Sequence, residues 1–117
     1  MSQEDILQPP KLPLLASEDE LPPGLGWAQV CLMRSGITLA PFKVARFSIE
    51  PGFASPLDSH AVDEIWIVTA GMGELLYDNQ SIRLQAGEVV YYDSYKAHQV
   101  RNDGMETLVM YSIWWRN

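Results

Sequence analysis

This 117-residue sequence is poor in several kinds of residue, and each shortage argues against a class of protein. A single cysteine, Cys31, rules out an internal disulfide framework and favours a reducing compartment. Eight Lys and Arg against fifteen Asp and Glu give a net charge of -7, which repels phosphate backbones and anionic lipid headgroups. We therefore expect neither nucleic acid nor a membrane surface to be a partner.

Long apolar runs are also missing. No segment reaches the roughly 20 apolar residues that are needed to span a bilayer. Residues 1–15 lack the basic flank and the apolar stretch of a signal peptide, so a cytoplasmic location is expected. Cys31 itself is expected to be a small buried side chain on a strand.

No segment of useful length repeats its apolar residues with a helical period. Prolines among acidic residues in residues 1–24 predict an extended arm, which can pack on the rest of the chain through Leu12, Leu14 and Leu15. From residue 25 onward, short β-branched and aromatic runs alternate with turn residues. This pattern predicts one all-β domain over residues 25–117.

Eight strands are predicted, and turn residues such as Pro51-Gly52, Asp78-Asn79 and Ala86-Gly87 separate them. So many short strands at close spacing form a small antiparallel barrel. The predicted strands cover residues 27–34, 42–50, 64–70, 73–77, 81–85, 88–92, 98–102 and 106–115.

Two of these strands are apolar on both faces. Residues 65–68 contain no polar side chain, and residues 108–115 are almost as apolar. One face of each strand can form the interior, but the other face needs a cover. We expect a homodimer, or the amino-terminal arm, to supply that cover.

The first of two histidines lies in a patterned stretch. Gly52 is followed after five residues by Asp58-Ser59-His60, then after three residues by Glu64 and after six by Gly71. This spacing resembles the first motif of the cupin superfamily, which has a glycine, a His-x-His pair, a glutamate and a second glycine. Asp58 stands where the first histidine of that motif usually stands.

The second histidine lies in a similar stretch. Gly87 is followed by Asp93 and Tyr95, and then by His98 and Asn102 with three residues between them. This stretch resembles the second cupin motif, with Asp93 and Tyr95 in place of its usual proline and second glycine. The resemblance covers residues 50–102 and implies a small antiparallel β-barrel of the jelly-roll or double-stranded β-helix type.

The resemblance implies one divalent metal ion inside the barrel, and the residues agree with it. Asp58 and His60 are two apart on an extended segment and share a face, and a hairpin can bring His98 to the face that carries Glu64. Imidazoles with carboxylates suit Fe, Mn, Zn, Ni or Co. Asp58 can be a direct ligand, act through a water molecule, or only cap a turn.

Successive side chains of the predicted strand after His60 point to opposite faces of the sheet. Glu64 is predicted on the inner face, where an unpaired carboxylate would be costly, whereas Asp63 is predicted to point away as a solvated or interface charge. Inner-face and neighbouring residues are candidates for a substrate pocket, although packing, or a surface position for the arginine, explains them too. The candidates are Arg46, Trp66, Tyr92, Val100, Met110 and Trp114.

The resemblance implies a site more firmly than a reaction, because one fold supports many chemistries. A metal-dependent enzyme that acts on a small organic molecule is favoured, of the dioxygenase, isomerase, lyase or cyclase type. The alternative is a cupin that binds or senses a small molecule without catalysis. The sequence assigns no catalytic residue. The metal candidates are Asp58, His60, Glu64 and His98.

Overall fold

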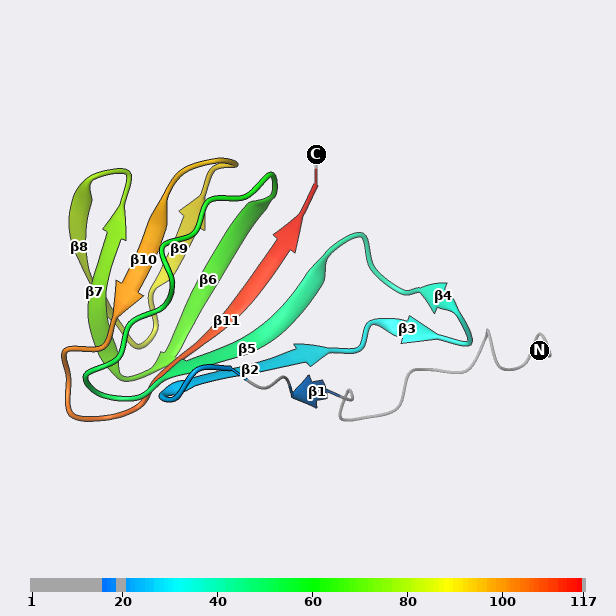
Figure 1. Cartoon of the computed structure of the whole chain (residues 1–117). Coiled ribbons are helices and arrows are strands. Elements are labelled where there is room, and N and C mark those ends of the chain that lie inside the picture. Colours follow the sequence, from blue (N-terminus) through cyan, green and yellow to red (C-terminus); the bar gives the residue numbers. More distant parts are fainter. Residues whose placement is uncertain (1–15, 19–20, 117) are drawn as a thin grey trace.

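The structure, a computed structural model, describes residues 16–18 and 21–116. All regular structure among these residues is β-strand, so this part of the chain has no helix that could cross a membrane. The strands of the described residues, shown in Figure 1, are β1 (Ala16–Glu18), β2 (Leu25–Val30), β3 (Met33–Arg34), β4 (Ile37–Thr38), β5 (Lys43–Ile49), β6 (Asp63–Ala70), β7 (Met72–Tyr77), β8 (Gln80–Gln85), β9 (Val89–Tyr92), β10 (His98–Arg101) and β11 (Leu108–Trp115).

Two antiparallel sheets form the body of the molecule. The larger sheet has the order β1-β2-β5-β11-β6-β9, and the smaller has the order β10-β7-β8. Leu75, Leu84 and Val100 of the smaller sheet pack in one buried cluster with apolar residues of the larger sheet, such as Val68 and Met110. The two sheets therefore enclose a single core, as expected for the predicted all-β barrel.

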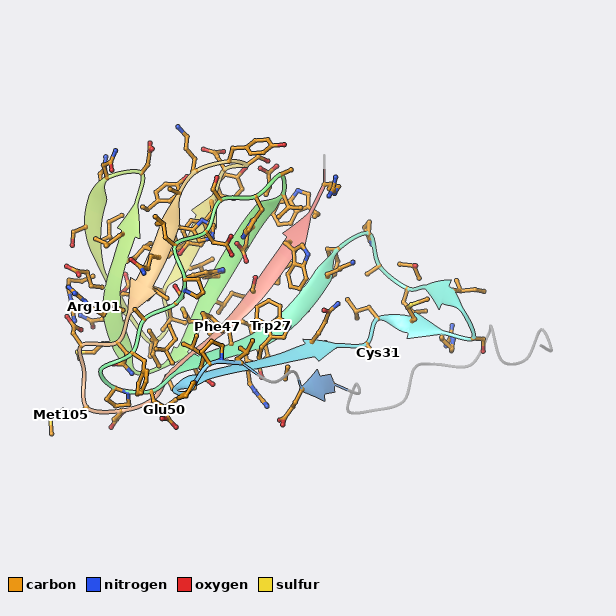
Figure 2. The ribbon with its side chains drawn as sticks, viewed as in Figure 1. Trp27, Cys31, Phe47, Glu50, Arg101 and Met105 are labelled. Carbon is orange, nitrogen blue, oxygen red and sulfur yellow. The ribbon has the colours of Figure 1, made fainter. Side chains whose placement is uncertain are left out.

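Most predicted strands are present, with ends displaced by at most two residues. The predicted strand 27–34 is instead divided into β2 and β3, and β1 and β4 were not predicted. After Val30 the chain leaves the main sheet and forms the projecting β3–β4 hairpin (Figure 1). The prediction that Cys31 is buried is wrong, because Cys31 lies at the start of this projection and is exposed (Figure 2).

The described part of the amino-terminal arm is attached to the domain. β1 pairs with β2 in antiparallel register, from Ala16 opposite Val30 to Glu18 opposite Ala28. Backbone pairing thus makes this short segment the edge strand of the larger sheet. The expected contacts of Leu12, Leu14 and Leu15 lie outside the described residues.

Asn102 connects three parts of the backbone near one end of the barrel. Its side chain is fully buried, and its Nδ2 donates to the carbonyl oxygens of Ile49 and Glu106, both at 2.8 Å. Its Oδ1 accepts the N–H of Gly104 at 2.9 Å. The motif asparagine is therefore a structural clamp that fixes the turn before β11 against the end of β5.

Candidate metal centre

Backbone pairing brings the two histidine segments together. The N–H of Asp58 donates to the carbonyl of His98 at 3.0 Å, and the N–H of His98 donates to the carbonyl of Asp58 at 2.9 Å. The segment before His60 therefore runs antiparallel to β10, although it is too irregular to count as a strand. This pairing sets the two motifs opposite one another.

His60, Glu64 and His98 form one cluster at the inner end of this pairing. Each offers a ligand atom, and these atoms all lie within 4.8 Å of one another. Nε2 of His98 lies 3.5 Å from Oε1 of Glu64, and both side chains are buried. Ligand atoms that share an ion of zinc or iron size are separated by roughly 3 to 4 Å, so the cluster can hold such an ion.

One hydrogen bond fixes the tautomer of His98 in its neutral form. Its Nδ1 lies 2.9 Å from the carbonyl oxygen of Lys96, and because a carbonyl only accepts, Nδ1 carries a proton. In the neutral ring, Nε2 then presents a lone pair toward Glu64. A hydrogen bond from the ring of a metal-binding histidine to a backbone carbonyl is the usual arrangement around protein metal ions.

The two carboxylate oxygens of Glu64 have different surroundings. Its Oε2 accepts a hydrogen bond from the hydroxyl of Ser112, whereas its Oε1 is buried without a hydrogen-bond donor in the described part of the chain. Oε1 and Nε2 of His98 thus face one another as two acceptors. A cation between them, either a metal ion or a proton on the imidazole, satisfies both, and the donor set fits a divalent ion.

Aromatic rings hold the imidazole of His98 in place. The ring of Tyr92 stacks on it at a centroid distance of 4.6 Å and an angle of 19°, and Trp66 meets it edge-on at 5.6 Å. Burial, followed by the nearby charge of Glu64, raises the pKa of Tyr92 far above its ordinary value. Tyr92 therefore remains a neutral packing surface behind the histidine.

Asp58 lies beside the cluster and is more exposed. Its Oδ2 is 3.5 Å from Nε2 of His60, and its Oδ1 accepts the N–H of Ser59 at 3.1 Å. It does not belong to the group whose ligand atoms all lie within 4.8 Å. The Asp58 carboxylate thus both caps the local turn and faces His60. Direct binding of a metal ion by Asp58 remains a proposal.

Asp63 differs from its prediction. It is only 6% exposed, and it accepts hydrogen bonds from the N–H and the hydroxyl of Ser94, both at 3.0 Å. The next residue in that loop, Tyr95, donates its N–H to the carbonyl of His60 at 2.8 Å. The expectation of a solvated charge is wrong, because this loop folds over Asp63 and joins the two histidine segments. The alternative expectation, an interface charge, stays a prediction.

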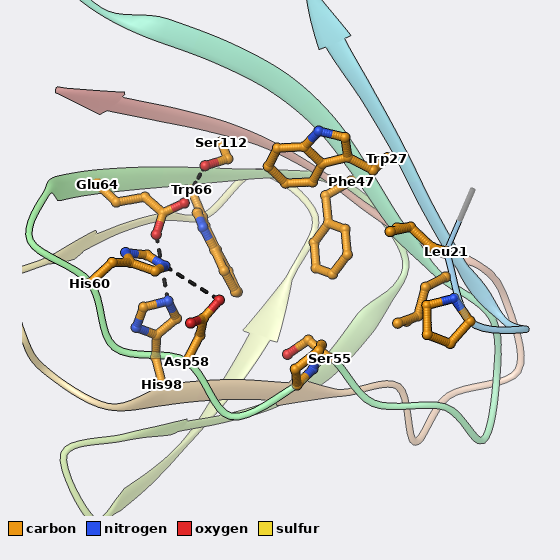
Figure 3. Close-up of a pocket in the computed structure, with 13 residues that line it drawn as sticks. Leu21, Trp27, Phe47, Ser55, Asp58, His60, Glu64, Trp66, His98 and Ser112 are labelled. Atoms are coloured by element: carbon orange, nitrogen blue, oxygen red, sulfur yellow. Dashed lines mark hydrogen bonds and ion pairs between the residues drawn. The ribbon is translucent and has the colours of Figure 1, made fainter. Parts of the chain in front are cut away.

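A cavity of about 250 Å³ adjoins the cluster. Figure 3 shows Trp66, a predicted pocket residue, between Glu64 and Phe47 in the wall of this cavity. Six of the other lining residues lie outside the two motifs, and two more, Ser55 and Pro56, lie within the first motif but were not predicted. The residues that line the cavity are Leu21, Pro22, Leu25, Trp27, Phe47, Ser55, Pro56, Asp58, His60, Glu64, Trp66, His98 and Ser112.

Five predicted pocket residues lie elsewhere. Val100 and Met110 are fully buried in the core, and Tyr92 lies behind His98. Trp114 packs against the ring of Trp27 at 5.7 Å without lining the cavity. These side chains support the wall instead of forming it.

The fifth predicted pocket residue, Arg46, lies on the outer face of β5. Alternation along β5 turns Ala45 and Phe47 into the core and leaves Arg46 exposed, with its guanidinium 3.7 Å from the carboxylate of Glu18. Arg46 therefore does not line the cavity.

Residues 45–114 match the model of the Cupin domain family. A solved Cupin 2 conserved barrel domain protein from Salinispora arenicola is 34% identical, with a TM-score of 0.71 over 82% of this chain and 79% of that one. A predicted oxalate decarboxylase from Thermotoga maritima is 19% identical, with a TM-score of 0.71 over 90% of this chain and 95% of that one, which shows the fold alone. The chain therefore belongs to the cupin family.

Proposed function

We propose that this cupin is a metal-dependent enzyme that acts on a small organic molecule in the cavity beside His60, Glu64 and His98. The observation that carries the proposal is the buried pair of facing acceptors, Oε1 of Glu64 and Nε2 of His98. His60 lies at the same point and is half-buried on the cavity side. Such an arrangement favours a cation with protein ligands on one side and the cavity on the other.

The residues around the three ligands have separate tasks in this proposal. Ser112 and the carbonyl of Lys96 orient Glu64 and His98, and Trp66 and Tyr92 restrict the imidazole. A divalent ion would supply Lewis-acid chemistry there, and iron or manganese would add redox chemistry. The apolar walls would exclude bulk water from the bound molecule.

An open ligand sphere supports catalysis over a purely structural metal. Structural zinc sites are usually closed by four protein ligands, whereas here three side chains group together and a cavity adjoins them. Two imidazoles and a carboxylate suit Fe, Mn, Zn, Ni or Co. The reaction type, whether of a dioxygenase, an isomerase, a lyase or a cyclase, depends on both the bound ion and the substrate.

Elemental analysis tests this proposal first. Protein purified without added metal is expected to hold close to one divalent ion per chain, and protein without a metal-binding capacity would contradict the proposal. Oxygen-uptake assays with phenols, diketones and thiols follow. Iron with oxygen uptake supports a dioxygenase, zinc supports Lewis-acid chemistry, and tight ligand binding without turnover supports the non-catalytic alternative.

A further inference from the structure

The cavity has two chemically different ends. Figure 3 shows a polar end made by Asp58, His60, Glu64 and His98. An apolar end is made by Leu21, Trp27 and Phe47. A molecule that reaches from one end to the other must therefore carry polar atoms at one end only.

The charges around the cavity are all on the polar end. Asp58 and Glu64 supply two carboxylates, which offset the two charges of a divalent ion. None of the Lys and Arg side chains that the structure describes lines the cavity. Several of them face acidic partners elsewhere: Arg46 with Glu18, Arg83 with Asp103, Lys96 with Asp78 and Arg101 with Glu74.

This balance disfavours a strongly anionic ligand. A dicarboxylate would bring two further negative charges into a cavity with mostly apolar walls. The described lining residues include no Lys or Arg, so only the metal ion would offset these charges. Removing such charges from water without partners is costly. A neutral or singly charged ligand avoids this cost.

The walls also limit the size and shape of the ligand. The cavity, at about 250 Å³, is smaller than the roughly 300 to 1,000 Å³ of clefts that hold drug-sized molecules. Trp27, Phe47 and Trp66 present aromatic surfaces, which pack well against flat molecules. Oγ of Ser55 accepts the N–H of Val100 at 2.9 Å, so its hydroxyl proton is available to a ligand oxygen.

We propose that the cavity takes a small, neutral or singly charged organic molecule with adjacent oxygen donors at one end and a flat apolar body at the other, and that it discriminates against dicarboxylates. This inference rests on the proposed metal site, because the ion is what holds the oxygen donors. It deepens the proposed function by naming the class of molecule on which the site acts.

Ligand titrations of the Co(II)-loaded protein test this inference. Tropolone and acetylacetone are the flat or apolar probes, and malonate and oxalate are the dicarboxylates. Changes in the visible cobalt spectrum report binding, and cobalt retained by the protein after gel filtration shows that the probe has not stripped the ion. Tropolone or acetylacetone is expected to bind at least tenfold more tightly than either dicarboxylate.

The outcomes separate the two proposals. Protein that takes up no cobalt contradicts the metal site itself. Protein that holds cobalt but binds the dicarboxylates at least as tightly, or binds none of the four probes, overturns the ligand class and leaves the metal site standing.

A pair of matched variants tests the cause of the preference. Leu21 is 39% exposed in the cavity wall, so Leu21→Arg adds a cation there with little risk to folding. Ile82 is 40% exposed on β8, away from the cavity, so Ile82→Arg adds the same charge elsewhere. Leu21→Arg is expected to strengthen malonate binding at least threefold and Ile82→Arg to leave it unchanged. Equal effects of the two variants would overturn the charge argument.

Discussion

His98 is the most constrained side chain of the site. A backbone carbonyl fixes one ring nitrogen, Tyr92 and Trp66 pack against the ring, and Glu64 faces the other nitrogen. These contacts pre-organise the imidazole for an ion, so little conformational freedom is lost on binding.

Removing either histidine is expected to abolish tight metal binding. His60→Ala and His98→Ala each delete one of three grouped ligands, whereas Asp58→Ala removes a carboxylate that lies at the edge of the group and is expected to have a smaller effect. Metal content after dialysis measures the loss, and circular dichroism checks that each variant is folded. Full metal content in both histidine variants would mean that the ion lies elsewhere.

The structural role of Asn102 can be tested without any metal ion. Asn102→Ala leaves two carbonyls and one N–H without their partner in a buried position, so the free energy of unfolding should fall by about 2 to 4 kcal/mol. Gln85→Ala, at an exposed position on β8, should change it by less than about 0.5 kcal/mol. Urea unfolding of both variants measures the difference, and equal midpoints would contradict the clamp.

The sequence predicted the grouping of the candidate metal ligands better than it predicted their surroundings. The spacing of the motifs was enough to group His60, Glu64 and His98, because strand alternation sets the direction in which a side chain points. Alternation does not reveal which loop covers an outward position, so the burial of Asp63 under Ser94 was missed. The wall formed by Trp27 depends on sheet pairing between distant segments, which motif spacing does not report.

Turns determine where the elements of this fold begin and end. Gly71, between β6 and β7, has a φ of +81°, and a Cβ there would lie 2.7 Å from the carbonyl oxygen of Thr107. Gly87, before β9, has a φ of +95°, but a Cβ there would meet nothing within 4 Å. The two glycines therefore share a backbone conformation and differ in the space around them.

Replacing each of these glycines with alanine separates the cost of backbone strain from the cost of a steric clash. Gly87→Ala should lower the free energy of unfolding by about 1 to 2 kcal/mol because of its positive φ alone. Gly71→Ala should lower it further, because the methyl group also collides with backbone atoms near Leu108. Thermal unfolding measures both, and a smaller loss for Gly71→Ala would contradict the packing of this turn.

Turn residues and short apolar runs predicted most of the strands, since both are local signals. The break between β2 and β3 was not predicted because the sequence from Trp27 to Arg34 stays compatible with one extended strand. Sheet pairing decides the break: β2 pairs with β5, whereas β3 pairs only with β4 in the described part of the chain. Such long-range pairing is not visible in a local pattern.

The whole molecule exposes several large apolar side chains near the projecting hairpin. Met33, Ile37 and Phe42 are each at least 40% exposed, and Met33 and Phe42 line a hollow beside β2. A two-stranded hairpin is marginally stable without support. We propose that the homodimer expected from the sequence makes its contact through the hairpin region, because exposed apolar patches often mark protein interfaces.

Light scattering on the purified protein measures the oligomeric state. We expect a mass of two chains, each of 13.2 kDa. The double variant Met33→Ser with Ile37→Ser should shift the mass toward one chain, since both side chains are exposed and bury little of the protomer's own core. A wild-type mass of one chain at all concentrations would contradict the dimer.

The central claim is that His60, Glu64 and His98 converge on one divalent ion at the inner end of the cavity. A crystal structure of metal-loaded protein with anomalous scattering at the metal edge tests it most directly. The account predicts one strong peak within roughly 2.0 to 2.2 Å of an imidazole nitrogen of each histidine and of a Glu64 oxygen. A peak bound by other side chains, or these three groups joined by hydrogen bonds alone in metal-saturated crystals, would contradict it.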